Sequence, residues 1–555
     1  MKVIVNGKEI EIEEGSTILE AARKAGYSVP TLCHQKGLCE EGSCRVCVCE
    51  VNGRIMSTCT HKASEGMNIV TNSEKVIKAR KQNLELLLSN HNFSCTNCSK
   101  EGKCKLQRYA SDYNCDIDKY AGDKKEYEVD DSSYSIVRDN SKCILCGKCI
   151  EVCSKIQSLN VYGKSKRGFE TSIGCAFGKK IKDSKCVGCG QCVLVCPTGA
   201  LSEKSEVELV LNAISQRSED TVVTVQMAPA VRVALSEEFG NPIGTVDEKK
   251  MVHALKLCGF DYVYDVNYGA DITVMEEEHE LLERIQKGEN LPQFSSCCPG
   301  WFNFVNENFP SLKENVSKCK SPNEMLASLV KYKFQNENKK AIVVAIMPCT
   351  AKKHEKIRCG GADFVLTTRE LAKLIKLKGI DFNSLEGADF DRPFGDYSGA
   401  SVIFGVTGGV TEAVLRTAIY HLTGEDKAEV KDVRVTEGLK EVSLSAGGVT
   451  LSLAIVSGLD NARKVCESII KGEKNYHFVE VMACPGGCVN GGGQPFVDYD
   501  KYSYADVIKL RSEGLFKLDL SSKKKQSHNN EGVTDIYKDV LKNDEKLIKK
   551  LFHNE

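Results

Sequence analysis

The placement of cysteine constrains this chain more than any other feature of its sequence. The 555 residues include 28 cysteines, and most of them stand in short, regularly spaced groups. A secreted disulfide scaffold is usually short and starts with a signal peptide. This chain is long and starts with MKVIVNGKEIEI, which alternates like a strand and has no apolar signal core. The cysteines therefore predict bound metal in a cytoplasmic protein.

Charge and hydropathy narrow the class of partner. Lys plus Arg number 75 and Asp plus Glu number 76, so no strong field favours nucleic acid or a membrane surface. No apolar run reaches the roughly 18 residues of a transmembrane helix. We expect neither nucleic acid nor membrane as a partner, and the length favours about four domains.

An internal repeat occupies residues 126–205. KCILCGKCIEVC starts at Lys142 and KCVGCGQCVLVCP starts at Lys185, and each has the spacing C-x2-C-x2-C-x3-C. This is the run of two-cluster bacterial ferredoxins, in which the fourth cysteine of each run ligates the other cluster. The repeat predicts two [4Fe-4S] clusters: dicluster site 1, with Cys143, Cys146, Cys149 and Cys196, and dicluster site 2, with Cys186, Cys189, Cys192 and Cys153.

The first 78 residues predict a smaller iron–sulfur domain. Two strands, MKVIVNG and KEIEIEE, precede a helix from Ser16, which is a β-grasp pattern. A C-x2-C pair flanked at a distance by single cysteines suits one [2Fe-2S] cluster, held by Cys33, Cys44, Cys47 and Cys59. A four-cysteine zinc site is the alternative. Cys39 rivals Cys33 as a ligand, and Cys49 is taken as a spare thiol.

Residues 79–125 add a mixed set of ligands. A helical stretch ends in the pattern H-x3-C-x2-C-x5-C, formed by His91, Cys95, Cys98 and Cys104. One imidazole and three thiolates can fill the four iron corners of a [4Fe-4S] cluster. A zinc site made by the same side chains is the competing interpretation.

From about residue 206 the pattern changes to strands alternating with helices. VELVLNAISQR and APAVRVALSEEFG are expected as helices, and TVVTVQM, DYVYDVNYG, AIVVAIM, SVIFGVTGG and HFVEVM as strands. Such alternation favours parallel α/β lobes. The polar tail from about residue 520, with one further helix, is expected to wrap the surface. No GxGxxG dinucleotide motif or P-loop is present.

Three cysteine loops follow predicted strands in this region. They are SSCCPGW with Cys297 and Cys298, MPCTAKKHE with Cys349, and MACPGGCVNGGGQP with Cys484 and Cys488. Ligands of open α/β sheets bind beyond the carboxyl ends of strands, and glycine lets backbone approach a bulky group closely. The loops are therefore expected to converge on one site between two lobes.

These three motifs, in this order, resemble the signatures of the [FeFe]-hydrogenases, and the N-terminal cysteine patterns resemble the front domains of the same enzymes. The resemblance implies a multidomain α+β chain: a β-grasp [2Fe-2S] ferredoxin-like domain (1–78), a His-ligated [4Fe-4S] module (79–125), a two-[4Fe-4S] bacterial ferredoxin-like domain (126–205), and a two-lobed α/β H-cluster catalytic domain with a small-subunit-like tail (206–555). The implied reaction is 2H⁺ + 2e⁻ ⇌ H₂.

The resemblance also assigns the catalytic cofactor and its ligands. The H-cluster is a [4Fe-4S] cubane joined through a cysteine sulfur to a di-iron unit that carries CO, cyanide and a bridging dithiolate. Its implied ligands are Cys298, Cys349, Cys484 and Cys488, with Cys488 as the bridge. Lys352 would hold a cyanide. Residues implied around the di-iron unit are Ala228, Pro229, Ser321, Asn323, Met347 and Met482.

A proton route is implied by the same comparison. Cys297 matches the proton-relay thiol, followed outward by Glu277, Ser317, Glu280 and Arg284. Positions 277, 280 and 284 share one helix face; without the family, the default interpretation is a solvated acidic face, and Glu276, Glu278 and Glu283 are equally available by spacing. The chain departs from the usual motifs at Ser295, commonly Thr, and at Asn323, commonly Gln, which leaves catalytic bias and rate open.

Four accessory clusters before a catalytic domain imply a relay of electrons. We expect ferredoxin or flavodoxin as the redox partner, and H-cluster maturation proteins as assembly partners. Alternatives are the hydrogenase subunit of an electron-bifurcating complex with NAD- and flavin-binding subunits, and a sensory homologue that binds H₂. An electron-transfer subunit of the complex I or formate dehydrogenase type would share residues 1–205 but not the three later motifs.

Overall fold

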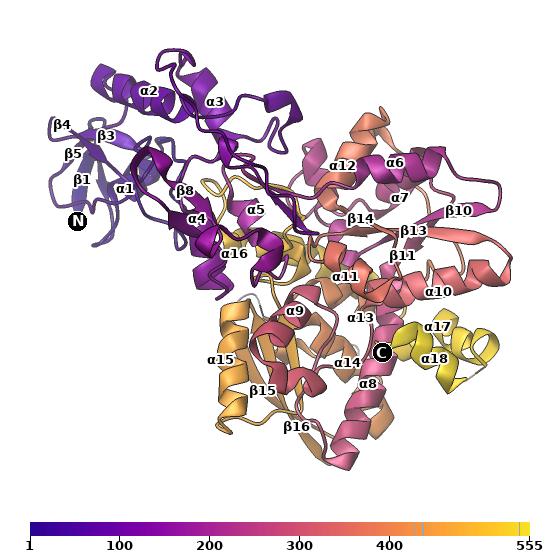
Figure 1. The fold of residues 1–555 in the computed structure, drawn as a ribbon. Coiled ribbons are helices and arrows are strands. Elements are labelled where there is room, and N and C mark those ends of the chain that lie inside the picture. Colours follow the sequence, from indigo (N-terminus) through magenta and orange to yellow (C-terminus); the bar gives the residue numbers. More distant parts are fainter. Residues whose placement is uncertain (428, 436–437, 543, 555) are drawn as a thin grey trace.

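The computed structural model describes residues 1–427, 429–435, 438–542 and 544–554. The N-terminal modules lie together at one end of the molecule, and two lobes make up the rest (Figure 1). No helix in the described ranges is long and apolar enough to cross a membrane.

The first module is a β-grasp, as predicted. Its five-stranded sheet has the order β2-β1-β5-β3-β4, with β1 Lys2–Val5, β2 Lys8–Glu11, β3 Val48–Val51, β4 Arg54–Ser57 and β5 Asn68–Val70. Helix α1 (Ile18–Lys24) starts two residues later than predicted, because Thr17 rather than Ser16 is its N-cap. Thr17 and Glu20 form a reciprocal capping box.

The next two modules are small. Helices α2 (Glu74–Leu88) and α3 (Lys105–Asp112) flank the His–Cys stretch. The internal repeat forms two short helices, α4 (Lys148–Glu151) and α5 (Gln191–Val195), each preceded by a glycine in the left-handed region, Gly147 and Gly190. Two strand pairs complete this part: β6 (Ile136–Arg138) with β9 (Leu201–Glu203), and β7 (Gly163–Ser165) with β8 (Ser172–Gly174).

The first catalytic lobe is built on a parallel sheet of order β11-β10-β13-β14. Its strands are β10 Thr221–Met227, β11 Tyr262–Asp265, β13 Lys340–Met347 and β14 Phe364–Thr367. Helices α6 (Val207–Ser215), α7 (Glu248–Cys258), α10 (Pro322–Asn336) and α12 (Thr368–Leu377) pack on it and share its apolar core. This lobe matches the predicted parallel α/β arrangement.

The second lobe has the strand order β12-β17-β16-β15. Strands β12 (Gln293–Phe294), β17 (Phe478–Met482) and β16 (Val449–Ser457) run parallel, whereas β15 (Leu439–Ala446) is antiparallel to β16. Its helices are α9 (Pro299–Asn308), α14 (Gly409–Thr423) and α15 (Leu459–Ile470). The expectation of purely parallel lobes is therefore wrong for this hairpin, since β15 and β16 are joined directly by a glycine turn.

Two segments differ from their predicted type throughout, and DYVYDVNYG is a strand only over Tyr262–Asp265, since its last four residues begin helix α8. SVIFGVTGG is not a strand: it forms α13 (Gly399–Val402) and a 3₁₀ turn, Ile403–Gly405. A short apolar run has no periodicity that separates a buried strand from a buried helix, and here the Ser398 side chain caps the helix. APAVRVALSEEFG forms two 3₁₀ turns, Pro229–Val231 and Leu235–Phe239, instead of one α-helix.

One long helix and the C-terminal tail connect the two lobes. Helix α8 (Val266–Lys287) contacts α10 in one lobe and α14 in the other. After α16 (Tyr504–Ser521), the tail forms α17 (Glu531–Asp535) and α18 (Glu545–Phe552), which lie beside α8 (Figure 1). The tail does more than wrap the surface, because Val533 and Phe552 are fully buried in the core of the first lobe.

Candidate active site

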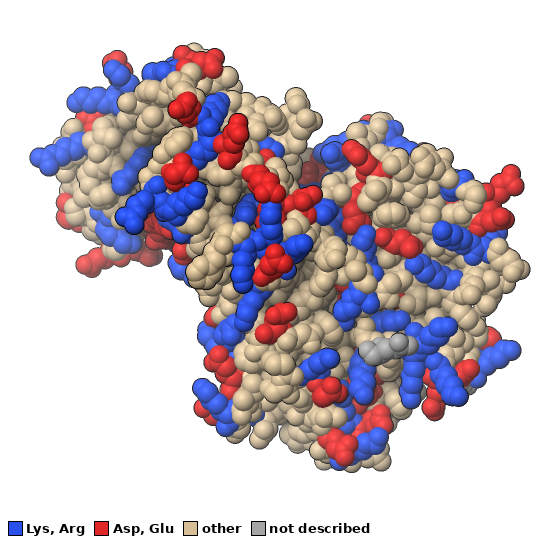
Figure 2. Space-filling model, in the orientation of Figure 1, with Lys and Arg blue, Asp and Glu red and all other residues tan. Residues whose placement is uncertain are grey.

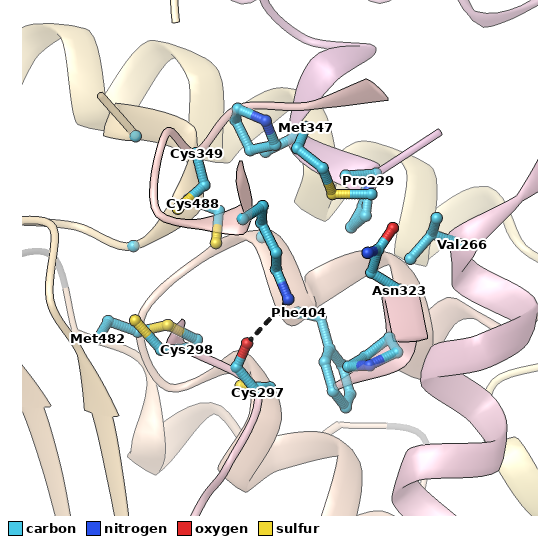
Figure 3. Close-up of a pocket in the computed structure, with 18 of the residues that line it drawn as sticks. Pro229, Val266, Cys297, Cys298, Asn323, Met347, Cys349, Phe404, Met482 and Cys488 are labelled. Atoms are coloured by element: carbon cyan, nitrogen blue, oxygen red, sulfur yellow. Dashed lines mark hydrogen bonds between the residues drawn. The ribbon is translucent and has the colours of Figure 1, made fainter. Parts of the chain in front are cut away.

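The three cysteine loops meet in one cavity between the lobes, as the strand-end rule predicts. Cys298 follows β12, Cys349 follows β13, and Cys484 and Cys488 follow β17. All four line a space of about 740 Å³ that holds no protein atoms. Figure 3 shows the sulfur atoms of Cys298, Cys349 and Cys488 facing this space.

Glycine permits the close approach of these loops. A Cβ on Gly491 would lie 2.3 Å from the Pro348 carbonyl oxygen, in the loop that carries Cys349. A Cβ on Gly487 would lie 2.8 Å from the Thr407 backbone nitrogen, and Gly487 has φ +94°. Larger residues at either position would force the loops apart.

The donor set fits a soft metal group. Burial raises the pKa of Cys349 to about 12, and burial also raises the pKa values of Cys298, Cys484 and Cys488. These thiols therefore remain protonated in the bare protein. They ionise when they bind a metal that accepts thiolate, which is the chemistry of iron–sulfur clusters.

Lys352 is the cation of the cavity. Its Nζ donates to Ser321 Oγ at 2.7 Å, to Glu355 Oε2 at 2.6 Å, and to the Cys297 carbonyl oxygen at 3.4 Å, the last drawn as the dashed line in Figure 3. Burial opposes its charge, but the Glu355 carboxylate more than offsets this, and the pKa of Lys352 is raised. A fixed ammonium thus faces the space beside the thiols.

The rest of the wall is mostly apolar. Ala228, Pro229, Met347 and Met482, all named from the sequence, line the cavity. Sequence reasoning missed Val266, Ala270, Phe404 and Gly405, which also line it. Phe404 and Gly405 belong to the segment that was expected as a strand, so its wrong assignment hid them.

Asn323 also lines the cavity, and its amide group is fixed by hydrogen bonds to two buried side chains. Gln226 Nε2 donates to Asn323 Oδ1 at 2.8 Å, and Asn323 Nδ2 donates to Glu324 Oε1 at 2.9 Å. The shorter side chain at this position is therefore fixed in one orientation by two buried partners, and Figure 3 shows it between Pro229 and Val266.

Cys297 lines the cavity, and Glu277 stands behind it. Burial, followed by the Glu277 carboxylate, raises the pKa of the Cys297 thiol well above its usual value. Glu277 is fully buried, and its Oε1 accepts from Ser296 N at 3.1 Å and Ser296 Oγ at 3.2 Å. Burial raises the pKa of Glu277 to about 7. Its Oε2 has no hydrogen-bond partner among the described residues.

Ser317, Glu280 and Arg284 continue outward from this point. Ser317 Oγ donates to Glu280 Oε2 at 2.6 Å, and Arg284 donates to Glu280 Oε1 at 2.7 Å. Glu280 and Arg284 line an open surface cleft of about 1410 Å³. Hydrogen bonds thus join Ser317, Glu280 and Arg284 in a group that reaches solvent. Glu277 interacts electrostatically with Glu280, but no hydrogen bond among the described residues joins it to Cys297 or Ser317.

The C-terminal tail closes one side of the surface cleft. Glu276 accepts from Tyr537 Oη at 2.5 Å and pairs with His553 Nε2 at 2.8 Å. Cys319 and His553 form an antiparallel bridge, with Asn554 N donating to the Lys318 carbonyl at 2.7 Å. These contacts hold the segment that carries Ser317, a role that the sequence did not suggest.

Glu480 is another buried carboxylate near Cys297 that sequence reasoning missed. It accepts from Gly408 N and Thr411 N, each at 2.7 Å, and so holds the start of α14 and the loop before it. Burial raises its pKa to about 7. The signal was available: a single charge in the middle of the apolar strand HFVEV.

The structure brings together the members of each predicted set of dicluster cysteines. Cys143, Cys146, Cys149 and Cys196 line one cavity, which is dicluster site 1. Cys153 lies with Cys186, Cys189 and Cys192, since each of the latter three thiols interacts electrostatically with it. The fourth cysteine of each run therefore faces the other run's set.

The mixed ligand set also surrounds a cavity. His91, Cys95, Cys98 and Cys104 line a space of about 680 Å³. His91 Nδ1 is buried without a hydrogen-bond partner among the described residues, and burial lowers its pKa to about 4. A neutral imidazole beside three thiols suits metal ligation.

The β-grasp cysteines gather at one end of the sheet. Cys33 Sγ and Cys44 Sγ are 3.3 Å apart, and Cys59 interacts with both Cys33 and Cys47. Cys39, the sequence rival of Cys33, instead donates to the Cys146 carbonyl at 3.5 Å. Cys49 Sγ accepts from Arg80 at 3.4 Å, so both spare thiols point elsewhere.

Glycine contacts join dicluster site 2 to the catalytic cavity. A Cβ on Gly492 would lie 2.3 Å from the Cys189 carbonyl and 2.6 Å from Gly190 Cα. Thr350 Oγ1 donates to the Gly188 carbonyl at 2.6 Å, and Gln191 Nε2 donates to the Asn490 carbonyl at 2.9 Å. Backbone therefore touches backbone between the two sites.

A similar contact joins the His–Cys module to dicluster site 1. A Cβ on Gly199 would lie 2.3 Å from Cys98 Sγ, and Cys104 Sγ lies 3.8 Å from the Pro197 carbonyl. Both belong to the loop that follows Cys196, so these two cysteine sets are also neighbours.

Family models match most of the chain. The C-terminal domain of the iron only hydrogenase large subunit matches residues 221–492, and the iron hydrogenase small subunit matches 505–555. A 2Fe-2S iron-sulfur cluster binding domain matches 1–74, the NADH-ubiquinone oxidoreductase-G iron-sulfur binding region matches 80–117, and a 4Fe-4S dicluster domain matches 138–200.

Individual relatives agree with these models. The chain is 40% identical to the NADP-reducing hydrogenase subunit HndD of Solidesulfovibrio fructosivorans, covering 98% of this chain and 96% of that protein. It is 37% identical to iron hydrogenase 1 of Clostridium pasteurianum, covering 97% and 96%. An apo [FeFe]-hydrogenase structure from Chlamydomonas reinhardtii superimposes with TM-score 0.56 and 36% identity, covering 63% of this chain and 98% of that one.

Proposed function

Because the chain belongs to the iron-only, or [FeFe], hydrogenase family and is an oxidoreductase acting on H₂, we propose that the cavity between its lobes is the H-cluster site. The observation that carries this proposal is the meeting of four cysteines, one buried lysine and one unligated cysteine in a single apolar cavity. The proposed ligands are Cys298, Cys349, Cys484 and Cys488, with Cys488 as the bridging sulfur.

The bound cofactor supplies the iron sites at which protons and electrons combine to H₂. The protein supplies ligation, charge and exclusion of water. Lys352 is suited to hold a cyanide ligand, because its ammonium is fixed by Ser321 and Glu355 and its side chain lines the cavity. The apolar wall of Pro229, Met347 and Phe404 strengthens such polar contacts by excluding water.

Cys297 is the proposed first proton relay. Its thiol faces the cavity but belongs to none of the four ligand positions, and the Glu277 carboxyl lies behind it. A carboxyl with a pKa of about 7 can both accept and give a proton near neutral pH. From Glu277 the route continues through Ser317 and Glu280 to Arg284 at the surface cleft.

Electrons are proposed to travel along the N-terminal modules. The line of sites runs from the β-grasp set and the His–Cys set to dicluster sites 1 and 2, and then to the cavity. Two observations support this order: Cys98 packs on Gly199 beside site 1, and Gly492 packs on Cys189 of site 2. The proposed domain boundaries are 78/79, 125/126 and 205/206.

Metal content tests the number of clusters. One [2Fe-2S] cluster, three accessory [4Fe-4S] clusters and the H-cluster give about 20 iron atoms per chain. Iron should be measured on anaerobic, matured protein, with infrared spectra for the CO and cyanide bands. Zinc in place of iron, or less than half of this iron content, would overturn the assignment of sites.

His91→Ala tests the mixed ligand set separately. It should alter one accessory electron paramagnetic signal and leave the CO and cyanide bands unchanged, because His91 lies outside the cavity. An unchanged set of accessory signals would remove His91 from the ligands.

The partner decides between two candidate roles. Ferredoxin or flavodoxin as direct donor is the first, with maturation proteins acting earlier in assembly. Membership in a complex with NAD- and flavin-binding subunits is the second role. The near full-length similarity to a protein named NADP-reducing hydrogenase subunit supports this second role. H₂ evolution by the isolated chain with reduced ferredoxin supports the first role, whereas a strict requirement for flavoprotein subunits supports the second.

A further inference from the structure

The segment between the two cysteine runs is not used by the proposed mechanism. We call residues 163–185 the basic loop. It contains β7, β8 and a turn at Ala176–Gly178. Its basic residues are Lys164, Lys166, Arg167, Lys179, Lys180, Lys182 and Lys185, against only two acidic residues, Glu170 and Asp183.

The inner face of the basic loop packs on both dicluster sites, and Cys175 lies on the side of site 2. Ile173, Cys175 and Ile181 are buried in an apolar cluster that holds cysteines of both sites, and Ile173 lines the cavity of site 1. Cys175 also interacts electrostatically with Cys153 and Cys186. Through Cys175, the loop therefore connects the surface to site 2 by a short path.

Hydrogen bonds to residues before and after the basic loop hold its inner face in place. The Ile181 backbone N–H donates to Asp130 Oδ2 at 3.0 Å, and Asn140 Nδ2 donates to the Ile173 carbonyl at 3.0 Å. Cys186 N donates to Ser184 Oγ at 3.3 Å. These contacts place the outer face in a defined position relative to the ligands.

The outer face presents an aromatic side chain in an unusual place. Phe177 is 100% exposed. Its φ is 57° and that of the next residue, Gly178, is 70°, and Lys179 N donates to the Ala176 carbonyl at 3.2 Å. This is the arrangement of a type I′ turn, whose first central position favours Asn, Asp or Gly. A phenyl ring there costs backbone energy and buries nothing, so the fold itself gives no reason for it.

The basic loop also carries cations without carboxylate partners. Lys164, Lys166 and Lys180 have carboxylate partners. Arg167, Lys179, Lys182 and Lys185 are exposed and have none among the described residues. In Figure 2, Lys and Arg side chains gather over the region where Figure 1 labels β8. An exposed aromatic side chain on a loop rich in unpaired cations has the composition of an interaction surface for an acidic partner.

We propose that the basic loop is the docking surface for an acidic protein electron carrier, with Phe177 as its central contact and dicluster site 2 as the acceptor. The proposal rests on the proposed function and adds an entry point beside the catalytic cavity that bypasses the β-grasp and His–Cys modules. In each encounter the carrier loses one electron and the cluster at site 2 gains it. Two encounters, with two protons from the proton route, balance one H₂.

Phe177→Asn in the matured full-length enzyme is the sharpest test. Asn suits the left-handed turn position better than Phe, so this change relieves strain and cannot weaken docking through misfolding. H₂ evolution is measured with a reduced acidic ferredoxin and, separately, with reduced methyl viologen, a small cation. We expect the KM for ferredoxin to rise about tenfold, as for loss of a central aromatic contact, and the viologen rate to stay unchanged.

A charge reversal tests the rim. The double variant Lys179→Glu/Lys182→Glu should raise the KM for ferredoxin further and flatten its dependence on ionic strength, because fewer charge pairs remain to be screened. Iron content and the CO and cyanide bands should match the unchanged enzyme.

The end of α12 supplies a matched control. There Leu377 is 59% exposed and has lysines near it in the sequence. Leu377→Asn therefore matches Phe177→Asn, and Lys373→Glu/Lys378→Glu matches the charge reversal, on a surface of the catalytic domain away from the basic loop. These controls should leave the KM for ferredoxin unchanged. Equal rises in the KM for ferredoxin in the basic-loop variants and the α12 variants would overturn the docking surface, and so would an unchanged KM in Phe177→Asn. In either case, H₂ evolution driven by viologen would still support the proposed function. The docking surface would also be overturned if the wild-type enzyme evolved H₂ with viologen but needed a flavoprotein subunit in place of ferredoxin.

Discussion

The two sides of the catalytic cavity are built in different ways. On the side of dicluster site 2, backbone meets backbone at Gly190 and Gly492. Beside Cys297, the wall is instead backed by buried carboxyl and hydroxyl groups, beginning with Glu277. The first side contains close contacts and few ionisable groups. The second contains buried ionisable groups, of which Glu280 is hydrogen-bonded to Ser317 and Arg284.

This difference follows from what each side is proposed to carry. An electron can cross a short gap between two clusters without an intermediate carrier. The side that carries electrons therefore needs a short distance between the clusters, and glycine provides it. A proton moves between groups that come within hydrogen-bond reach, and it moves most readily through a group whose pKa lies near the working pH. Burial supplies such a value for Glu277. We call the contact of Gly190 with Gly492 the electron side, and Cys297 with the groups behind it the proton side. A change on one side should leave the other side intact.

The largest expected effect is on the proton side. Cys297→Ser keeps the approximate size of the side chain but replaces a thiol with a hydroxyl, a far weaker acid in the same surroundings, so turnover should fall by about 10²- to 10⁴-fold. The CO and cyanide infrared bands should persist. Cys298→Ser should instead disturb the cubane, because a hard alcohol is a poor ligand at this position. The reverse pattern would exchange the two roles.

The electron side should respond to one added methyl group. Gly492→Ala would place a Cβ against the Cys189 carbonyl and Gly190 Cα, and such overpacking costs about 1–3 kcal/mol. We expect slower reduction of the cavity from the accessory clusters and weaker magnetic coupling between site 2 and the H-cluster. Gly122→Ala is the control, since a Cβ there meets nothing within 4 Å. Unchanged coupling in Gly492→Ala would remove the contact from the electron route.

The pH dependence sharpens the proton side. The pKa of Glu277 is raised from its usual 4.5 to about 7, so the carboxyl is neutral below about pH 7 and charged above it. H₂ evolution, which needs a proton to give, should therefore decline as the pH rises through 7. An infrared band of a protonated carboxyl should disappear over the same range and be missing in Glu277→Gln. Titration of that band near 4.5 would contradict the assignment.

The smallest effect is expected at the outer end of the proton side. His553→Ala removes the pair with Glu276, an interaction of about 0.5–1.5 kcal/mol at a partly exposed position. Exchange of the Lys320 and Asn554 amide hydrogens, which bond across the bridge to the tail, should accelerate by a few-fold, with turnover nearly unchanged. His528→Ala, elsewhere in the tail, should leave these amides as they are. Equal acceleration in both variants would mean that the bridge does not depend on Glu276.

The four neighbouring glutamates of α8 show where sequence reasoning stops. Spacing alone made them equivalent, but Glu276 pairs with the tail, Glu278 lies 3.0 Å from His421, and Glu283 pairs with Lys287 at the surface. Only Glu277 points to the cavity side, against Ser296. Which face of the helix is buried depends on α10 and α14, whose packing no local pattern encodes.

The sequence by itself determined which cysteines gather where the members of a set lie close together in the chain, because C-x2-C spacing fixes local geometry. It also determined the convergence of the three late loops, because parallel strands carry their loops to one edge. Only the tertiary structure decided that SVIFGVTGG is helical and lines the cavity, that the tail holds the Ser317 segment, and that Phe177 stands in water. These features depend on contacts between residues far apart in the chain, where burial and neighbouring charge, rather than spacing, set the conformation and the chemistry of each side chain.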